Sequence, residues 1–179
     1  VDAEKKLQKR VLHWLVDDLG YTYLGNLEDI DNTPVKEDLL KANLKQRGYS
    51  NDQIKTAISE LLSKVNNQVD TLYQINRGVY SLLRYGRQGA KDEHGRRQTV
   101  HYINWDDIDS NDFYVAEEVS VLRFDKVTRK RPDVVLYING IALGVFELKS
   151  SYVSAGKGIR QMLQNQKREN ILNFFSTAQ

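Results

Sequence analysis

The chain contains no cysteine, and this absence excludes disulfide bonds and thiolate metal sites. Its three histidines, His13, His94 and His101, are too scattered to predict a zinc site. No apolar run approaches the roughly 20 residues that a membrane-spanning helix needs. The charged N-terminus lacks the apolar segment of a signal peptide. We therefore expect a protein of the reducing cytoplasm that has no membrane partner.

The chain also lacks a large excess of charge of either sign, since its net charge is +2. Binding of nucleic acid through bulk charge is excluded, so any such binding must come from local patches. Its 179 residues, 40% of them hydrophobic, predict a single globular domain over 1–179. Because an initiator methionine is missing and Phe174-Phe175 lies close to the end, we expect this domain to belong to a longer protein.

The first half of the sequence predicts helices. One capping signal is Thr33-Pro34, which favours a helix that begins there, and the other is the capping box that starts at Ser50. Apolar spacing and these caps predict helices over 3–19 and 67–85, two helices within 33–64, a strand near 21–25 and a helical insertion over about 28–66.

The second half predicts strands. Residues 86–98 are rich in glycine and charge, which indicates a mobile loop or a solvated hairpin tip. Runs of β-branched and aromatic residues then predict strands at 99–105, 113–122, 133–138 and 141–149. A last amphipathic segment predicts a helix at 158–175. This order is typical of an α/β fold with a mixed β-sheet flanked by helices.

The most informative stretch is an apolar hairpin with charges at its two ends. Two apolar strands meet at Asn139-Gly140, a strong hairpin signal, and the hairpin brings Asp133 together with Glu147 and Lys149. Buried charges cost several kcal/mol each unless they are paired or bind a metal. Two carboxylates with a nearby lysine therefore predict a Mg²⁺ site, and a structural salt bridge is the alternative.

The length of the hairpin loop decides whether the two carboxylates share a face. A two-residue loop pairs Ile138 with Ile141 and Asp133 with Phe146, so that Asp133 faces away from Glu147. A shared face needs a loop with an odd number of residues, or a β-bulge. We predict a three-residue loop, Ile138-Asn139-Gly140, with its glycine in the left-handed region.

These residues resemble a known nuclease motif. Pro132-Asp133, thirteen further residues and then Glu147-Leu148-Lys149 look like the PD-(D/E)xK pattern. The stretches NDFYVAEEV, RPDVVLYINGIALGVFELK and GIRQMLQNQ resemble the N-terminal endonuclease domain of type I restriction enzyme R (motor) subunits, over nearly the whole chain. The resemblance implies a restriction-endonuclease-like core.

The resemblance also implies an activity and partners. The activity is Mg²⁺-dependent hydrolysis of phosphodiester bonds in unmodified foreign DNA, in which Mn²⁺ can replace Mg²⁺. The partners are double-stranded DNA and the methylation and specificity subunits of a restriction-modification complex. An ATP-driven helicase or translocase is expected C-terminal to this segment. ATP is expected to bind only there, because this chain has no Walker A motif.

Site residues follow from the hairpin and from the resemblance. We expect Asp133, Glu147 and the backbone carbonyl of Leu148 to hold Mg²⁺, and Lys149 to position the attacking water. Gln161 matches the glutamine of the family's Gln-x-x-x-Tyr motif, but Asn165 stands at the tyrosine position.

Two of the site predictions have plain structural alternatives. Glu4 is the candidate for a helix glutamate of the superfamily and should face the sheet, although a first-turn acid also suits the helix dipole. An apolar stripe formed by Ile159, Met162 and Leu163 is expected to face the core, and Gln161 lies on the opposite side of the helix. A functional glutamine and a solvent-facing residue without a function are therefore equally good interpretations of Gln161.

Two other functions remain open at this stage. A non-catalytic docking module would keep the nuclease fold only to bind partner subunits, and an inactive full complex would favour it. A stand-alone resolvase or repair nuclease would cut branched or damaged DNA as the isolated fragment.

Overall fold

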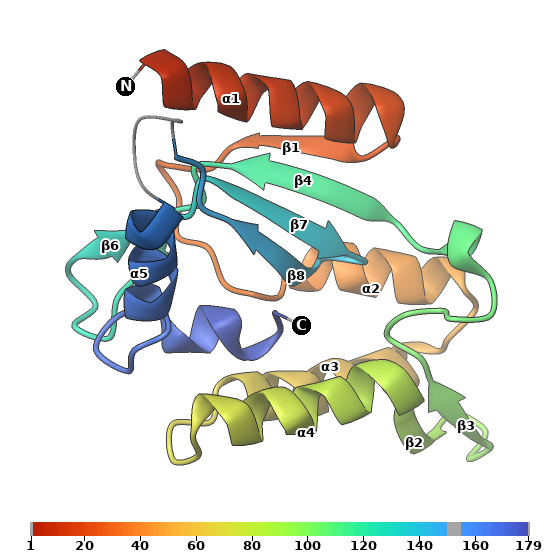
Figure 1. Ribbon diagram of the computed structural model, residues 1–179. Helices are drawn as coiled ribbons and strands as arrows, with labels where there is room; N and C mark the ends of the chain where they lie inside the picture. The colour runs from red at the N-terminus through yellow and green to blue at the C-terminus, as the bar shows by residue number, and fades with distance from the viewer. Residues whose placement is uncertain (1, 150–154, 179) are drawn as a thin grey trace.

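The computed structural model describes residues 2–149 and 155–178, and its centre is a four-stranded mixed sheet (Figure 1). The strand order is β1-β4-β7-β8, with β1 parallel to β4 and the other neighbours antiparallel. The strands are β1 (Thr22–Asn26), β4 (Phe113–Glu117), β7 (Val134–Ile138) and β8 (Ile141–Phe146). The α/β fold with a mixed sheet that the sequence predicts is confirmed.

Helices cover both faces of this sheet. Helix α1 (Asp2–His13) continues as a π-helical turn (Trp14–Asp18), and its apolar side packs against Val115, Val134 and Leu136. The opposite face packs against the C-terminal part of the chain, which contains α5 (Ala155–Asn165) and the 3-10 helix η3 (Leu172–Ser176). Because side chains alternate along a strand, neighbouring residues of β7 serve these two separate cores.

A second layer lies below the sheet in Figure 1. It consists of α2 (Glu37–Gln46), α3 (Asn51–Val65), α4 (Leu72–Tyr85) and the hairpin of β2 (Arg87–Lys91) and β3 (Arg97–Val100). Ile141 of β8 belongs to its hydrophobic core. Three short elements complete the described chain: η2 (Ile108–Ser110), β5 (Val121–Leu122) and β6 (Arg129–Lys130). Within the described residues, no helix is long and apolar enough to cross a bilayer.

Several predicted boundaries are wrong in the first half. The helix expected at Thr33 begins at Glu37, because Val35 instead forms a β-bridge with Ile141. The helix expected from 67 begins after Thr71, whose side chain completes a capping box. The capping box predicted at Ser50 is confirmed.

Other predicted boundaries are wrong in the second half. The segment 86–98 is part of a hairpin whose turn residues 93–96 are exposed, so the solvated hairpin tip is confirmed, although the paired strands on either side were not predicted. The strand expected over 113–122 breaks at Glu118, which has a positive φ of 51° and donates its backbone N–H to the Asp133 carbonyl at 2.9 Å. Two further strands and the last helix end earlier than predicted, at Val100, Phe146 and Asn165, whereas the strand predicted over 133–138 ends at Ile138 as expected.

The hairpin that carries the candidate site has a two-residue loop, so the predicted three-residue loop is wrong. Asn139 and Gly140 have φ values of 51° and 84°, and Ile138 pairs with Ile141. Farther along, Leu136 pairs with Gly144, which leaves Leu143 as the extra residue of a bulge. A β-bulge was the alternative that the sequence analysis allowed. It shifts the pairing by one residue, so that Asp133 and Glu147 share a face of the sheet.

Gly140 is required at this turn for two reasons, and we expect Gly140→Ala to destabilise the fold by about 2–5 kcal/mol. Its φ is unfavourable for other residues, and an added Cβ would lie 2.6 Å from the Lys36 carbonyl oxygen and 2.8 Å from Leu39 Cβ. The matched control is Gly95→Ala, because Gly95 has a φ of +77° with nothing within 4 Å of its Cβ position. Urea unfolding should show the larger loss for Gly140→Ala, and equal losses would contradict this account.

Candidate active site

The bulge places the two predicted acids opposite each other at one end of the sheet. Continuing the pairing of Val134 with Phe146 sets Asp133 beside Glu147. The Leu148 backbone N–H donates to Asp133 Oδ2 at 2.6 Å, which ties the two strand ends together. The N-terminal end of α1 and helix α5 lie at this same end of the sheet (Figure 1).

The pKa of Glu147 is raised from 4.5 to about 7. Burial is the largest cause, and the negative charge of Asp133 acts in the same direction. The positive charges of Lys149 and Lys130 and a hydrogen bond from Asn165 lower the pKa but do not compensate. Glu147 is therefore a carboxylate that a bound cation would stabilise.

The pKa of Asp133 is also raised, with burial as the largest cause. The charges of Glu118 and Glu4 act in the same direction, while Leu148 N–H and Lys149 oppose it. Glu4, half-buried on α1, is thus close enough to the candidate site to act on Asp133, as its predicted inward direction requires. Perturbed acids that repel each other are a frequent mark of a functional site.

Helix α5 holds Glu147 from the other side. The Gln161 amide donates to Glu147 Oε2, and Asn165 Nδ2 donates to Glu147 Oε1 at 2.9 Å. The structure therefore brings both motif positions to the candidate site. Asn165 Oδ1 is buried without a hydrogen-bond partner among the described residues.

The apolar stripe predicted for α5 is wrong. Ile159 and Leu163 are 59% and 58% exposed, and of the three residues only Met162 packs on the core. The side of α5 toward the sheet is polar because it meets the Glu147 carboxylate. Gly158 lies beside the candidate site, since a Cβ there would be 3.4 Å from Lys149 Cγ, an ordinary van der Waals distance.

Gln8 on α1 is a site residue that sequence reasoning missed. It is buried, and its amide donates to Glu117 Oε2 at 2.7 Å and to Glu118 Oε1 at 3.2 Å. Arg131 Nε lies 2.8 Å from Glu118 Oε2. Gln8 could have been found from its spacing, because it follows Glu4 by four residues and both side chains therefore lie on one face of the helix.

The donors at this site suit a hard divalent cation that keeps open positions. Among residues 2–149 and 155–178, no three His, Cys, Asp or Glu side chains form a ready metal-ligand group. Mg²⁺ is commonly held by one or two carboxylates, with water and substrate phosphates as its other ligands. The pair Asp133 and Glu147, with their raised pKa values and the unpartnered oxygen of Asn165, fits such an open site.

Comparison with known proteins agrees with the resemblance in the sequence. A family model described as "Type I restriction enzyme R protein N terminus" matches residues 3–179. A curated relative from Methanocaldococcus jannaschii, "Putative type I restriction enzyme MjaIXP endonuclease subunit", is 30% identical over 142 residues. That alignment covers 74% of this chain and 14% of the relative. The chain belongs to the family of type I restriction enzyme R protein N-terminal domains.

Proposed function

We propose that this chain is the endonuclease domain of a type I restriction-modification complex. It hydrolyses phosphodiester bonds of unmodified foreign double-stranded DNA, in a complex with methylation and specificity subunits. ATP is used only by the longer protein. The observation that carries the proposal is the bulged hairpin, which sets Asp133 beside Glu147 within reach of the Lys149 charge.

Each residue of the site has a task in this reaction. Asp133, Glu147 and the Leu148 carbonyl would hold Mg²⁺, which when bound supplies Lewis-acid stabilisation of negative charge on the phosphate. Lys149 orients the attacking water, whose oxygen bonds to phosphorus as the bridging P–O bond breaks. Its ammonium group also stabilises charge that develops on the phosphate oxygens. Gln161 fixes the direction of the Glu147 carboxylate.

The family membership favours this function over a stand-alone resolvase or repair nuclease. A docking module is disfavoured by the electrostatics. Two adjacent acids with raised pKa values destabilise a fold that makes no use of them.

Metal affinity tests the proposal and the task of Gln161 together. We expect wild type to bind Mn²⁺ and Gln161→Ala to bind it about ten- to a hundredfold more weakly, because the second hydrogen-bond layer orients metal ligands. The matched control is Gln164→Ala on the exposed side of the same helix, which should bind like wild type. Titration of free Mn²⁺ by electron paramagnetic resonance measures this. If wild type does not bind Mn²⁺, the proposed nuclease function is contradicted. If all three proteins bind Mn²⁺ equally, the proposed role of Gln161 in orienting Glu147 is contradicted.

A further inference from the structure

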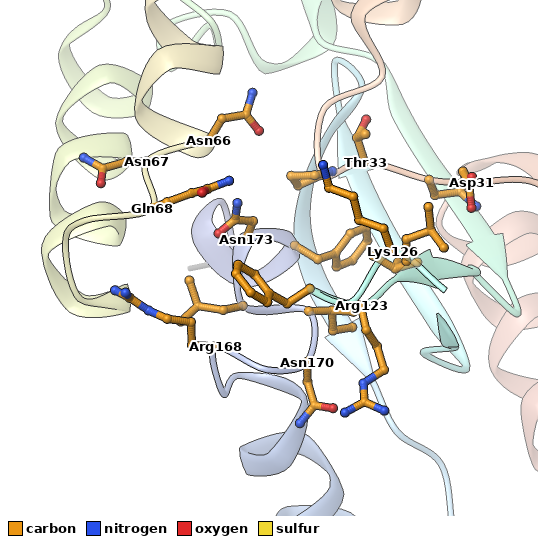
Figure 2. A pocket seen from close by; sticks show the side chains of 18 of the residues that line it. Asp31, Thr33, Asn66, Asn67, Gln68, Arg123, Lys126, Arg168, Asn170 and Asn173 are labelled. Carbon is orange, nitrogen blue, oxygen red and sulfur yellow. The ribbon is translucent and has the colours of Figure 1, made fainter. Parts of the chain in front are cut away.

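Figure 2 shows a cavity of about 690 Å³ whose lining includes neither Asp133 nor Glu147. Four segments line it: residues 31–34, the α3–α4 connection at 66–70, the β5–β6 hairpin at 121–126, and residues 168–174 after α5. Its volume falls in the range of about 300–1,000 Å³ that is usual for small-ligand pockets. We call it the hairpin pocket.

Polar groups without partners line the hairpin pocket. The side-chain amides of Asn66 and Gln68, which are exposed, and of half-buried Asn173 make no hydrogen bond with any described residue. Arg123 Nε is buried and also has no partner among the described residues. Amides that carry both donors and acceptors match the edges of nucleobases, as seen where proteins bind unpaired bases.

The charge of the hairpin pocket favours an anion. Lys126, Arg123 and Arg168 line it from two different segments, against two acids. One of these acids, Asp31, is paired with Arg129 outside the lining, whereas Asp70 keeps its charge. Arg168 Nη2 also donates to the backbone carbonyls of Val69 and Asp70, at 3.3 Å each. A net cationic lining remains for a phosphate group.

The hairpin pocket also offers an apolar surface to a flat ring. The accessible ring is that of Phe124 on the hairpin, which is 63% exposed, whereas Ile171 and Phe174 of the lining are buried in the core. An exposed phenyl ring beside cations is the arrangement on which single-stranded bases stack.

Two contacts connect the hairpin pocket to the candidate active site. Ile171 of the lining donates its backbone N–H to the carbonyl of Asn165, whose side chain holds Glu147. Val121 of the lining pairs with Lys130, whose charge lowers the pKa of Glu147. The hairpin pocket and the candidate active site are therefore joined through the segment that follows α5 and through the β5–β6 pair.

We propose that the hairpin pocket binds one unpaired nucleotide of the DNA strand engaged at the active site. Its phosphate contacts Lys126 and Arg168, its base stacks on Phe124, and the free amides bind the base edge. The inference rests on the proposed function, in that the ligand is DNA. If the pocket binds in this way, the protein prefers DNA that has an unpaired nucleotide beside the cleavage position.

The test compares two fluorescein-labelled probes by anisotropy, in EDTA so that nothing is cut. One probe is a blunt duplex, and the other is the same duplex with a single-stranded tail. We expect wild type to bind the tailed probe roughly tenfold more tightly, in line with the stacking of one base. Phe124→Ala and Lys126→Glu should remove this preference. The matched control Lys41→Glu, on an exposed face of α2 outside the lining, should keep it.

Each other outcome is decisive. Equal binding of both probes by wild type, or a tail preference that survives in both pocket variants, would overturn the proposal. The same holds if Lys126→Glu weakens both probes by one factor and keeps the preference, because the contact is then to phosphate alone. Failure to bind either probe would instead count against the proposed function. Circular dichroism confirms that each variant is folded.

Discussion

Replacing Lys149 with methionine is expected to lower the rate of DNA cleavage by about a hundred- to a thousandfold. The loss should appear in catalysis and not in metal binding. The positive charge of Lys149 lowers the pKa of both Asp133 and Glu147. Its removal leaves the negative charges of the two carboxylates less compensated, so a bound cation still stabilises them. The measurement is cleavage of plasmid DNA by the proposed complex, in which this chain is the N-terminal part of an R subunit assembled with methylation and specificity subunits.

The matched control for this prediction is Lys130→Met. Lys130 also acts on Glu147 through its charge but lies on β6, outside the Asp133–Glu147–Lys149 group. We expect it to reduce cleavage less than about tenfold, as suits an indirect electrostatic effect. Equal losses for the two variants would show that Lys149 acts only through the local charge and not on the reacting atoms.

Replacing Glu147 with glutamine is expected to stabilise the metal-free chain above pH 7, by about 1–3 kcal/mol after allowance for solvent screening. In the folded protein the pKa of Glu147 is raised from 4.5 to about 7. The folded state therefore holds a proton that the unfolded state releases between these pH values. The stability of wild type falls as the pH rises through this window, and the loss is complete above it.

Glu147→Gln should therefore flatten the pH dependence of unfolding between pH 4.5 and 7. Urea unfolding at several pH values without metal measures both the gain in stability and its pH dependence. A variant that is less stable than wild type at pH 8 would contradict the electrostatic account of the site. Such a gain in stability is the trade-off that the proposed metal-binding role of Glu147 predicts.

The two acids and the lysine of the candidate site could be predicted from the sequence, because all three lie at the ends of one hairpin. Asp133, Glu147 and Lys149 are the charges at the ends of two apolar strands, and the Asn139-Gly140 turn brings those ends together. The bulge at Leu143 could not be predicted, because nothing in the local pattern marks which residue is left unpaired. Contacts of the hairpin with a distant segment, including the pairing of Val35 with Ile141, exist only in the folded chain.

The polar face of α5 was misjudged for a related reason. Ile159, Met162 and Leu163 form the apolar stripe that normally faces a core, and this rule fails when the helix meets a buried carboxylate. Gln161 and Asn165 are four residues apart and share the face toward Glu147. The family motif already pointed to these two positions, whereas helical periodicity alone pointed away from Gln161.

The most direct test of the central claim is calorimetric titration of Mn²⁺ into wild type, Asp133→Asn and Glu147→Gln. The proposed protein ligands, Asp133, Glu147 and the Leu148 carbonyl, all belong to this chain, so the titration tests the carboxylate pair itself. We predict measurable binding by wild type, and its loss in both variants while circular dichroism shows that they remain folded. Equal binding in all three proteins, or none in any of them, would contradict the assignment of Asp133 and Glu147 as the metal site.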